Sequence, residues 1–111
     1  MDSNNVVVVR GLFSSEPYLR ELPAGGIVTQ FDVTTRTSAL SASVPVAAYD
    51  RTVDVAAGDE VVVIGHVNRR FFRTGGTTQS RTELVAGEVI RASRKRAVEK
   101  AISALKKMLT G

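Results

Sequence analysis

The 111-residue sequence has no cysteine and no tryptophan, and its only histidine is His66. Without cysteine the chain forms no disulfide and has no thiolate for metal binding or nucleophilic attack. A lone histidine on a strand is far more often a packing or surface residue than a ligand or a general base. The carboxylates show no paired spacing, and the Gly-Gly pairs lack the strand–glycine–helix context of a phosphate loop. The sequence therefore predicts a non-enzymatic protein without a metal or cofactor.

A charged-then-apolar leader is also missing, and no apolar run approaches the length that spans a bilayer. A chain of this length forms one domain with a sizeable core. We therefore expect a soluble, cytoplasmic protein with no membrane partner.

Lysine is missing from the first 90 residues, which hold eight arginines against ten carboxylates, a net charge of −2. Residues 91–111 hold seven lysines and arginines against Glu99 alone, a net charge of +6. This asymmetry indicates an acidic partner, of which nucleic acid is the commonest, although a charge run is more often only a solvated face.

Valine-rich stretches between glycine and proline turns predict a small antiparallel barrel, an all-β fold. Pro45 cannot donate a ladder hydrogen bond, so its strand has a free edge or a bulge there. Residues 36–43 are small, polar and unpatterned, which predicts a mobile loop, and residues 50–57 form a connector with at most one helical turn. The expected strands and extended segments span residues 5–13, 18–23, 27–35, 44–49, 60–65 with a continuation to the Gly75-Gly76 tip, and 81–90.

The hydrophobic period changes to that of a helix over residues 92–109, where an apolar stripe consists of Val98, Ala101, Ile102, Leu105, Met108 and Leu109. Ser93 is a plausible N-cap, and Gly111 ends the chain. The apolar stripe docks on the barrel or builds an oligomer, while the basic face can add phosphate contacts; a membrane-surface helix fits less well because Trp and Phe are missing. The basic face carries Lys95, Arg96, Lys100, Lys106 and Lys107.

The stretch from Val61 to Arg73 concentrates the chain's chemistry. Arg69, Arg70 and Arg73 surround two adjacent phenylalanines just before the hairpin tip. Cations neutralise phosphates and aromatic faces accept bases, so the pattern suits an anionic ligand with planar rings. An exposed hairpin with arginines for solubility is the equally simple alternative. By alternation, Phe71 should point away from Phe72, into the core or an interface.

Five segments, in this order and spacing, together resemble the bacterial single-stranded DNA-binding protein family, whose domain is an oligonucleotide-binding (OB) barrel. They cover residues 5 to about 90 and are Val7-Val8-Val9-Arg10-Gly11-Leu12-Phe13, Glu16-Pro17-Tyr18-Leu19-Arg20 with Pro23-Ala24-Gly25-Gly26, Phe31-Asp32-Val33-Thr34-Thr35, Gly58-Asp59-Glu60-Val61-Val62-Val63-Ile64-Gly65, and Thr82-Glu83-Leu84-Val85.

The resemblance implies a five-stranded OB barrel over residues 1–91, followed by the basic helix over 92–111. It implies binding of single-stranded DNA without sequence preference in replication, recombination or repair, with replication or repair proteins as possible partners. Tyr49 and Phe72 keep rings at the family's stacking positions, although the Tyr49 ring could also pack on the barrel rim. Arg69, Arg70, Arg73 and Arg81 would contact phosphates. The near-continuous valine runs offer more apolar surface than one small barrel needs, which favours a homodimer or homotetramer.

The chain departs from the family pattern in four places. Ser43 stands where the family has a stacking tryptophan, the loop aromatic before it is missing, and Pro45 replaces an arginine. A basic helix takes the place of the acidic tail that recruits other replication and repair proteins. These departures leave a second hypothesis open, in which the barrel serves as a protein-interaction or assembly module with little DNA binding.

Overall fold

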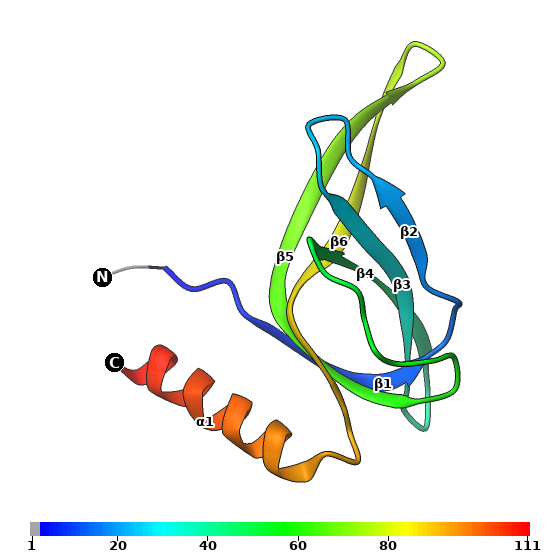
Figure 1. The fold of residues 1–111 in the computed structure, drawn as a ribbon. Coiled ribbons are helices and arrows are strands. Elements are labelled where there is room, and N and C mark those ends of the chain that lie inside the picture. The colour runs from blue at the N-terminus through cyan, green and yellow to red at the C-terminus, as the bar shows by residue number, and fades with distance from the viewer. Residues whose placement is uncertain (1–2) are drawn as a thin grey trace.

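Residues 3–111, the part of the chain that the computed structural model describes, form six strands and one helix (Figure 1). The elements are β1 (Val7–Phe13), β2 (Tyr18–Glu21), β3 (Ile27–Arg36), β4 (Ser41–Tyr49), β5 (Glu60–Thr74), β6 (Thr77–Arg91) and α1 (Lys95–Thr110).

Five of the strands close into a barrel. β1 pairs with β5 along most of its length and with β3 at Leu12 and Phe13, so the ring runs β1–β3–β4–β6–β5 and back to β1. The β4–β6 pairing is parallel and the others are antiparallel. The short β2 lies outside the ring, on the free edge of β3. The predicted five-stranded barrel with a C-terminal helix is confirmed.

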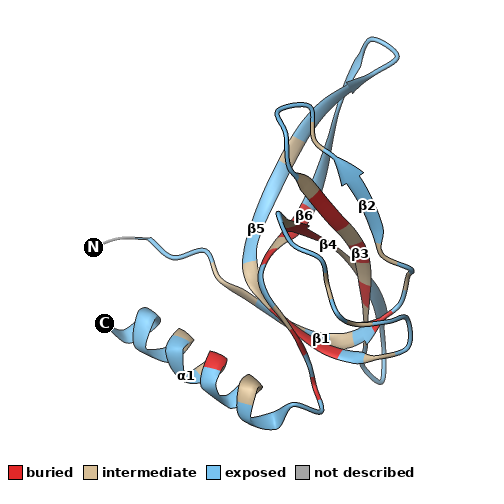
Figure 2. Ribbon diagram, in the orientation of Figure 1, coloured by how far each residue is buried: buried red, intermediate tan, exposed pale blue. Residues whose placement is uncertain are grey.

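The barrel interior is filled by side chains of all five strands. Buried residues on the barrel strands are red in Figure 2. Phe13 and Phe31 stack with their ring centroids 4.5 Å apart, and Val33, Val63 and Leu84 pack in the same cluster. Each such side chain contributes roughly 1.5–3 kcal/mol when it is fully buried. This core holds the strand register, and the register decides which side chains reach the outer face.

A glycine pair sets the bend between β5 and β6. Ile64 lies opposite Glu88 but Gly65 lies opposite Ala86, so Gly87 is an extra residue in the ladder. Such a bulge bends a strand and increases its twist. A Cβ on Gly65 would lie 1.9 Å from the carbonyl oxygen of Val85, so only glycine fits at this crossing.

The predicted loop over residues 36–43 is wrong at both ends. β3 runs to Arg36 and β4 begins at Ser41, and these two residues are paired, so only residues 37–40 form the turn. Both faces of this β3–β4 tip are exposed, and a strand with two exposed faces shows no apolar alternation. Pro45 pairs with Asp32 of β3 just before the β4–β6 pairing starts at Val46, which is the free-edge position that proline requires.

The helix begins three residues later than predicted, at Lys95, and ends at Thr110 with Gly111 as its C-cap. Its N-cap is Arg94, which makes no capping hydrogen bond, so the prediction of Ser93 was wrong. Ala101 is the only buried residue of α1. No helix in the described part of the chain is long and apolar enough to cross a membrane. Residues 50–57 connect β4 to β5 without any helical turn.

Candidate nucleic-acid interface

The strands β5 and β6 extend beyond the barrel as a two-stranded arm, which we define as residues 69–82 (Figure 1). Side chains alternate between the faces of the arm, because successive residues of a strand point in opposite directions. Arg70 and Phe72 share one face, with Arg81 and Gln79 directly opposite them on β6. We call this side the ligand face; it continues on the outside of the barrel.

Arg70 and Phe72 contact each other on the ligand face. The guanidinium carbon of Arg70 lies 5.6 Å from the centroid of the Phe72 ring, within the range of a cation–π interaction. The Nε atom of Arg70 is buried and has no hydrogen-bond partner. The Phe72 side chain is 37% exposed, so its ring is open to a stacking partner.

Arg81 brings a second positive charge opposite Arg70. Like charges directly opposite each other on neighbouring strands destabilise a sheet. No ion pair in residues 3–111 neutralises either of them; the pairs are Arg10 with Glu60 and Arg91 with Asp59. An anion between the two guanidinium groups would relieve this repulsion.

Tyr49 lies on the outside of the barrel, at the end of β4. It is two residues from Ala47, which pairs with Val85 on the outer face, and its hydroxyl lies 3.5 Å from Oε1 of Glu83. Glu83 is only 3% exposed. The half-buried Tyr49 ring therefore has a packing role on the barrel surface and keeps one part open to solvent.

The other predicted residues of the ribbon lie on the opposite face of the arm. Arg69 and Arg73 alternate with Arg70 and Phe72, and Nη2 of Arg73 donates a hydrogen bond of 3.1 Å to the carbonyl of Gly76 at the tip. Phe71 does point away from Phe72, but it is 66% exposed, so it does not enter the core of its own chain. The structure thus brings together Arg70, Phe72 and Arg81 and separates them from Arg69 and Arg73.

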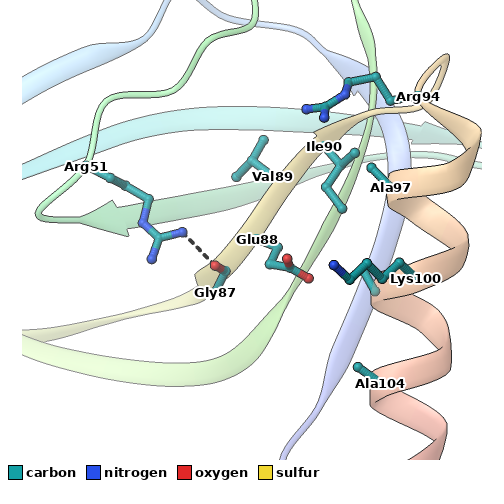
Figure 3. A pocket seen from close by; sticks show the side chains of 10 residues that line it. Arg51, Gly87, Glu88, Val89, Ile90, Arg94, Ala97, Lys100 and Ala104 are labelled. Carbon is teal, nitrogen blue, oxygen red and sulfur yellow. Dashed lines mark hydrogen bonds between the residues drawn. The ribbon is translucent and has the colours of Figure 1, made fainter.

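The basic residues of α1 lie at the other end of the barrel from the arm (Figure 1). The helix runs beside the last part of β6, and a groove of about 490 Å³ separates them (Figure 3). Arg51, Arg94 and Lys100 surround this groove together with Glu88, and Nη1 of Arg51 donates a 2.6 Å hydrogen bond to the carbonyl of Gly87. The predicted helix residues are all exposed; they are Lys95, Arg96, Lys100, Lys106 and Lys107.

Tyr18 is a ligand-face residue that the sequence pattern did not single out. It pairs with Gln30, Gln30 pairs with Ala47, and Ala47 pairs with Val85, so these residues form one row across the outer face. The Tyr18 side chain is 63% exposed. A tyrosine placed between a proline and a charged segment was a possible signal, but only the β2–β3 register gives the face on which it lies.

Comparison of the sequence with protein-family models gives no match, and comparison with curated proteins gives none either. Among solved structures, the chain is similar to the Plasmodium falciparum SSB in complex with ssDNA, with a TM-score of 0.69 and 20% identity over 82% of this chain and 97% of that chain. The likeness supports the OB fold of the chain. The assignment to the bacterial family stays a prediction.

Proposed function

We propose that the protein binds single-stranded DNA without strong sequence preference, in replication, recombination or repair. The observation that carries this proposal is the placement of the half-buried Arg70 with the exposed Phe72 and Arg81 on one face of the arm. The fold supports it, because the structurally similar Plasmodium SSB was solved with ssDNA bound.

Binding combines charge neutralisation with base stacking. Phosphates occupy the space between Arg70 and Arg81, and counterion release from the strand then favours the complex. One base stacks on Phe72 and another on the open part of Tyr49. A stacked base contributes roughly 1–3 kcal/mol, so two aromatic platforms give moderate rather than tight binding.

Oligomerisation is part of the proposal. A homodimer or homotetramer would bury apolar side chains that one chain leaves exposed on its strands, including Val8 (44%), Val67 (43%) and Phe71 (66%). Several ligand faces on one particle would also raise the apparent affinity for a long strand through multivalency. Sedimentation at several protein concentrations measures the mass.

Titration of a fluorescent oligo-dT at several salt concentrations tests the function. We expect affinity to fall as salt rises, because phosphate contacts release counterions. The double variant Arg70→Ala, Phe72→Ala should lose most of the binding while keeping the circular dichroism spectrum of the wild type. Absence of binding at low salt, or an affinity indifferent to salt, would refute the proposal.

A protein-interaction module is the second candidate, and α1 favours it. Met108 is 52% exposed and Leu109 is 49% exposed, although both belong to the apolar stripe of the helix. In this alternative the helix stripe binds a partner and the ligand face is unused. The Arg70→Ala, Phe72→Ala variant would then keep all of its interactions, which distinguishes the two functions.

A further inference from the structure

A small pocket lies on the ligand face beside Arg81, between the start of the β2 segment and the middle of β3. Its volume is about 190 Å³, below the range of pockets that hold drug-sized ligands and suited to a single ring system. Residues from three separate parts of the chain line it: Ser15, Glu16, Tyr18, Gln30, Phe31, Asp32 and Arg81.

The charged side chains around this pocket are not paired with each other. Within residues 3–111, neither of the two ion pairs includes Glu16, Asp32 or Arg81. The structure gives no side-chain hydrogen bond for these three residues or for Tyr18 and Gln30; Asp32 bonds to the Ser14-Ser15 segment through its backbone alone. The carboxylates, the amide, the phenol and the guanidinium therefore keep their hydrogen-bonding capacity for a ligand.

The charges decide which part of a nucleic acid enters. The pocket has two carboxylates, Glu16 and Asp32, against one arginine, so it repels a phosphate, whereas the neighbouring Arg70–Arg81 pair attracts one. An ionised carboxylate only accepts hydrogen bonds. Two carboxylates can each accept one hydrogen of the exocyclic amino group of cytosine. Thymine and uracil present a carbonyl at that position and only a single donor, the N3–H, beside it, so the pocket favours the amino-bearing base.

We propose that this pocket takes one base of the bound strand and selects bases that carry an exocyclic amino group. Tyr18, 63% exposed, supplies a ring face at the pocket wall, and Asp32 with Glu16 accepts the amino hydrogens. Arg81, which lines the pocket and also faces Arg70, connects the base to the phosphate site. This inference rests on the proposed DNA binding and adds a base preference to it at one position.

The test compares oligo-dC with oligo-dU of equal length in the same salt and buffer at slightly alkaline pH. The two bases differ along one edge, where cytosine has an amino group beside an acceptor nitrogen and uracil has a carbonyl beside a single N3–H donor. We expect the wild-type protein to bind oligo-dC roughly fivefold more tightly, the low end of the range for one base-edge contact. Equal affinities, or tighter binding of oligo-dU, would overturn the base preference while leaving DNA binding intact. No binding of either strand would overturn the proposed function itself.

Variants of the pocket assign the preference to its carboxylates. In the double variant Glu16→Gln, Asp32→Asn, each amide can present either an acceptor or a donor. The ratio of the affinity for oligo-dC to that for oligo-dU should therefore fall to about one. Neither carboxylate makes a side-chain hydrogen bond in the described structure, so the variant should fold, and circular dichroism checks this. A preference that survives the double substitution would refute the role of the carboxylates.

A matched control separates base reading from overall charge. Asp54→Asn removes one carboxylate from the exposed β4–β5 connector, and Asp54 does not line the pocket. It should raise affinity for both strands equally, if at all, and leave their ratio at the wild-type value. Tyr18→Ala should weaken binding of both strands because it removes a ring face that either base can use. A Tyr18→Ala variant with wild-type affinity would exclude that ring from the site.

Discussion

Arg70 and Arg81 lie directly opposite each other on β5 and β6, and neither has a carboxylate partner within residues 3–111. Two guanidinium groups in this position repel each other in the free protein. The same arrangement would favour a complex with a polyanion, because one phosphate could interact with both guanidinium groups. The pair would then lower the stability of the free protein and strengthen the proposed binding.

Replacing Arg81 with glutamine should change stability and binding in opposite directions. The free energy of unfolding should rise by roughly 0.2–1 kcal/mol at low salt, because the repulsion from Arg70 is removed. Affinity for oligo-dT should fall, and the slope of log affinity against log salt should decrease by about 0.7, the value for one phosphate contact with a single strand. Urea unfolding and fluorescence titration measure the two effects.

The control for this prediction is Arg69→Gln, on the other face of the arm. Arg69 lies opposite Thr82 rather than another cation, so its removal relieves no repulsion. We expect a smaller change in both stability and salt slope. Equal effects of Arg81→Gln and Arg69→Gln would mean that DNA does not bind one face of the arm in preference to the other.

The two adjacent phenylalanines provide a second matched pair. Phe72→Ala removes the ring that contacts Arg70 and faces the ligand, so affinity for oligo-dT should fall by roughly 1–3 kcal/mol. Phe71→Ala removes a more exposed ring, 66% against 37%, from the opposite face and should leave the affinity of one ligand face unchanged. If Phe71 lies in an oligomer interface, its removal should instead lower the mass in sedimentation. A larger loss of affinity with Phe71→Ala than with Phe72→Ala would mean that the DNA binds the face of the arm opposite the ligand face.

The local sequence pattern was sufficient to predict the barrel and to place Arg70 and Phe72 on the same face of the arm. Valine runs bounded by glycine indicated the strands, and simple alternation separated Phe71 from Phe72. Alternation alone does not predict whether the far face of the arm packs on a core. Phe71 lies on the arm, beyond the end of the barrel, and is 66% exposed.

The register between strands that are far apart in the chain could not be predicted from the sequence. Tyr18 belongs to a four-residue strand that is exposed along its whole length, so no hydrophobic pattern gives its orientation. The pocket beside Arg81 needs β2, β3 and β6 at once, and residues 15 and 81 are far apart in the chain. The sequence predicted a loop over the paired strand ends at Arg36 and Ser41 for a related reason. Exposed serine and threonine residues show no alternation of apolar and polar side chains that would indicate a strand.

The bend between β5 and β6 predicts a large stability effect at a single glycine. Gly65→Ala would place a Cβ 1.9 Å from the carbonyl oxygen of Val85 and 2.8 Å from Cδ2 of Leu84. Relief of that overlap requires the backbone to move, so we expect a loss of roughly 1–3 kcal/mol in the free energy of unfolding. Gly87→Ala, in the same bulge, meets only the Ile64 carbonyl at 3.4 Å and should cost less. Urea unfolding of both variants measures the difference, and equal costs would contradict this account of the crossing.

The position of α1 predicts that its basic face contributes to affinity only for long DNA strands. The helix lies beside the end of β6, whereas the ligand face follows the arm and β2, so a short oligonucleotide on the arm does not reach the helix (Figure 1). Neutralising Lys95, Arg96, Lys106 and Lys107 to glutamine should therefore leave the affinity for an oligo-dT of about 8 nucleotides unchanged, a length within the range covered by one OB fold. For a strand several times longer, the salt slope should decrease by about 0.7 for each phosphate that the helix no longer neutralises. Filter binding with the two lengths in parallel provides the measurement. Equal weakening for both lengths would mean that the helix is part of the primary site, and no weakening for either would leave its apolar stripe as the functional side of α1.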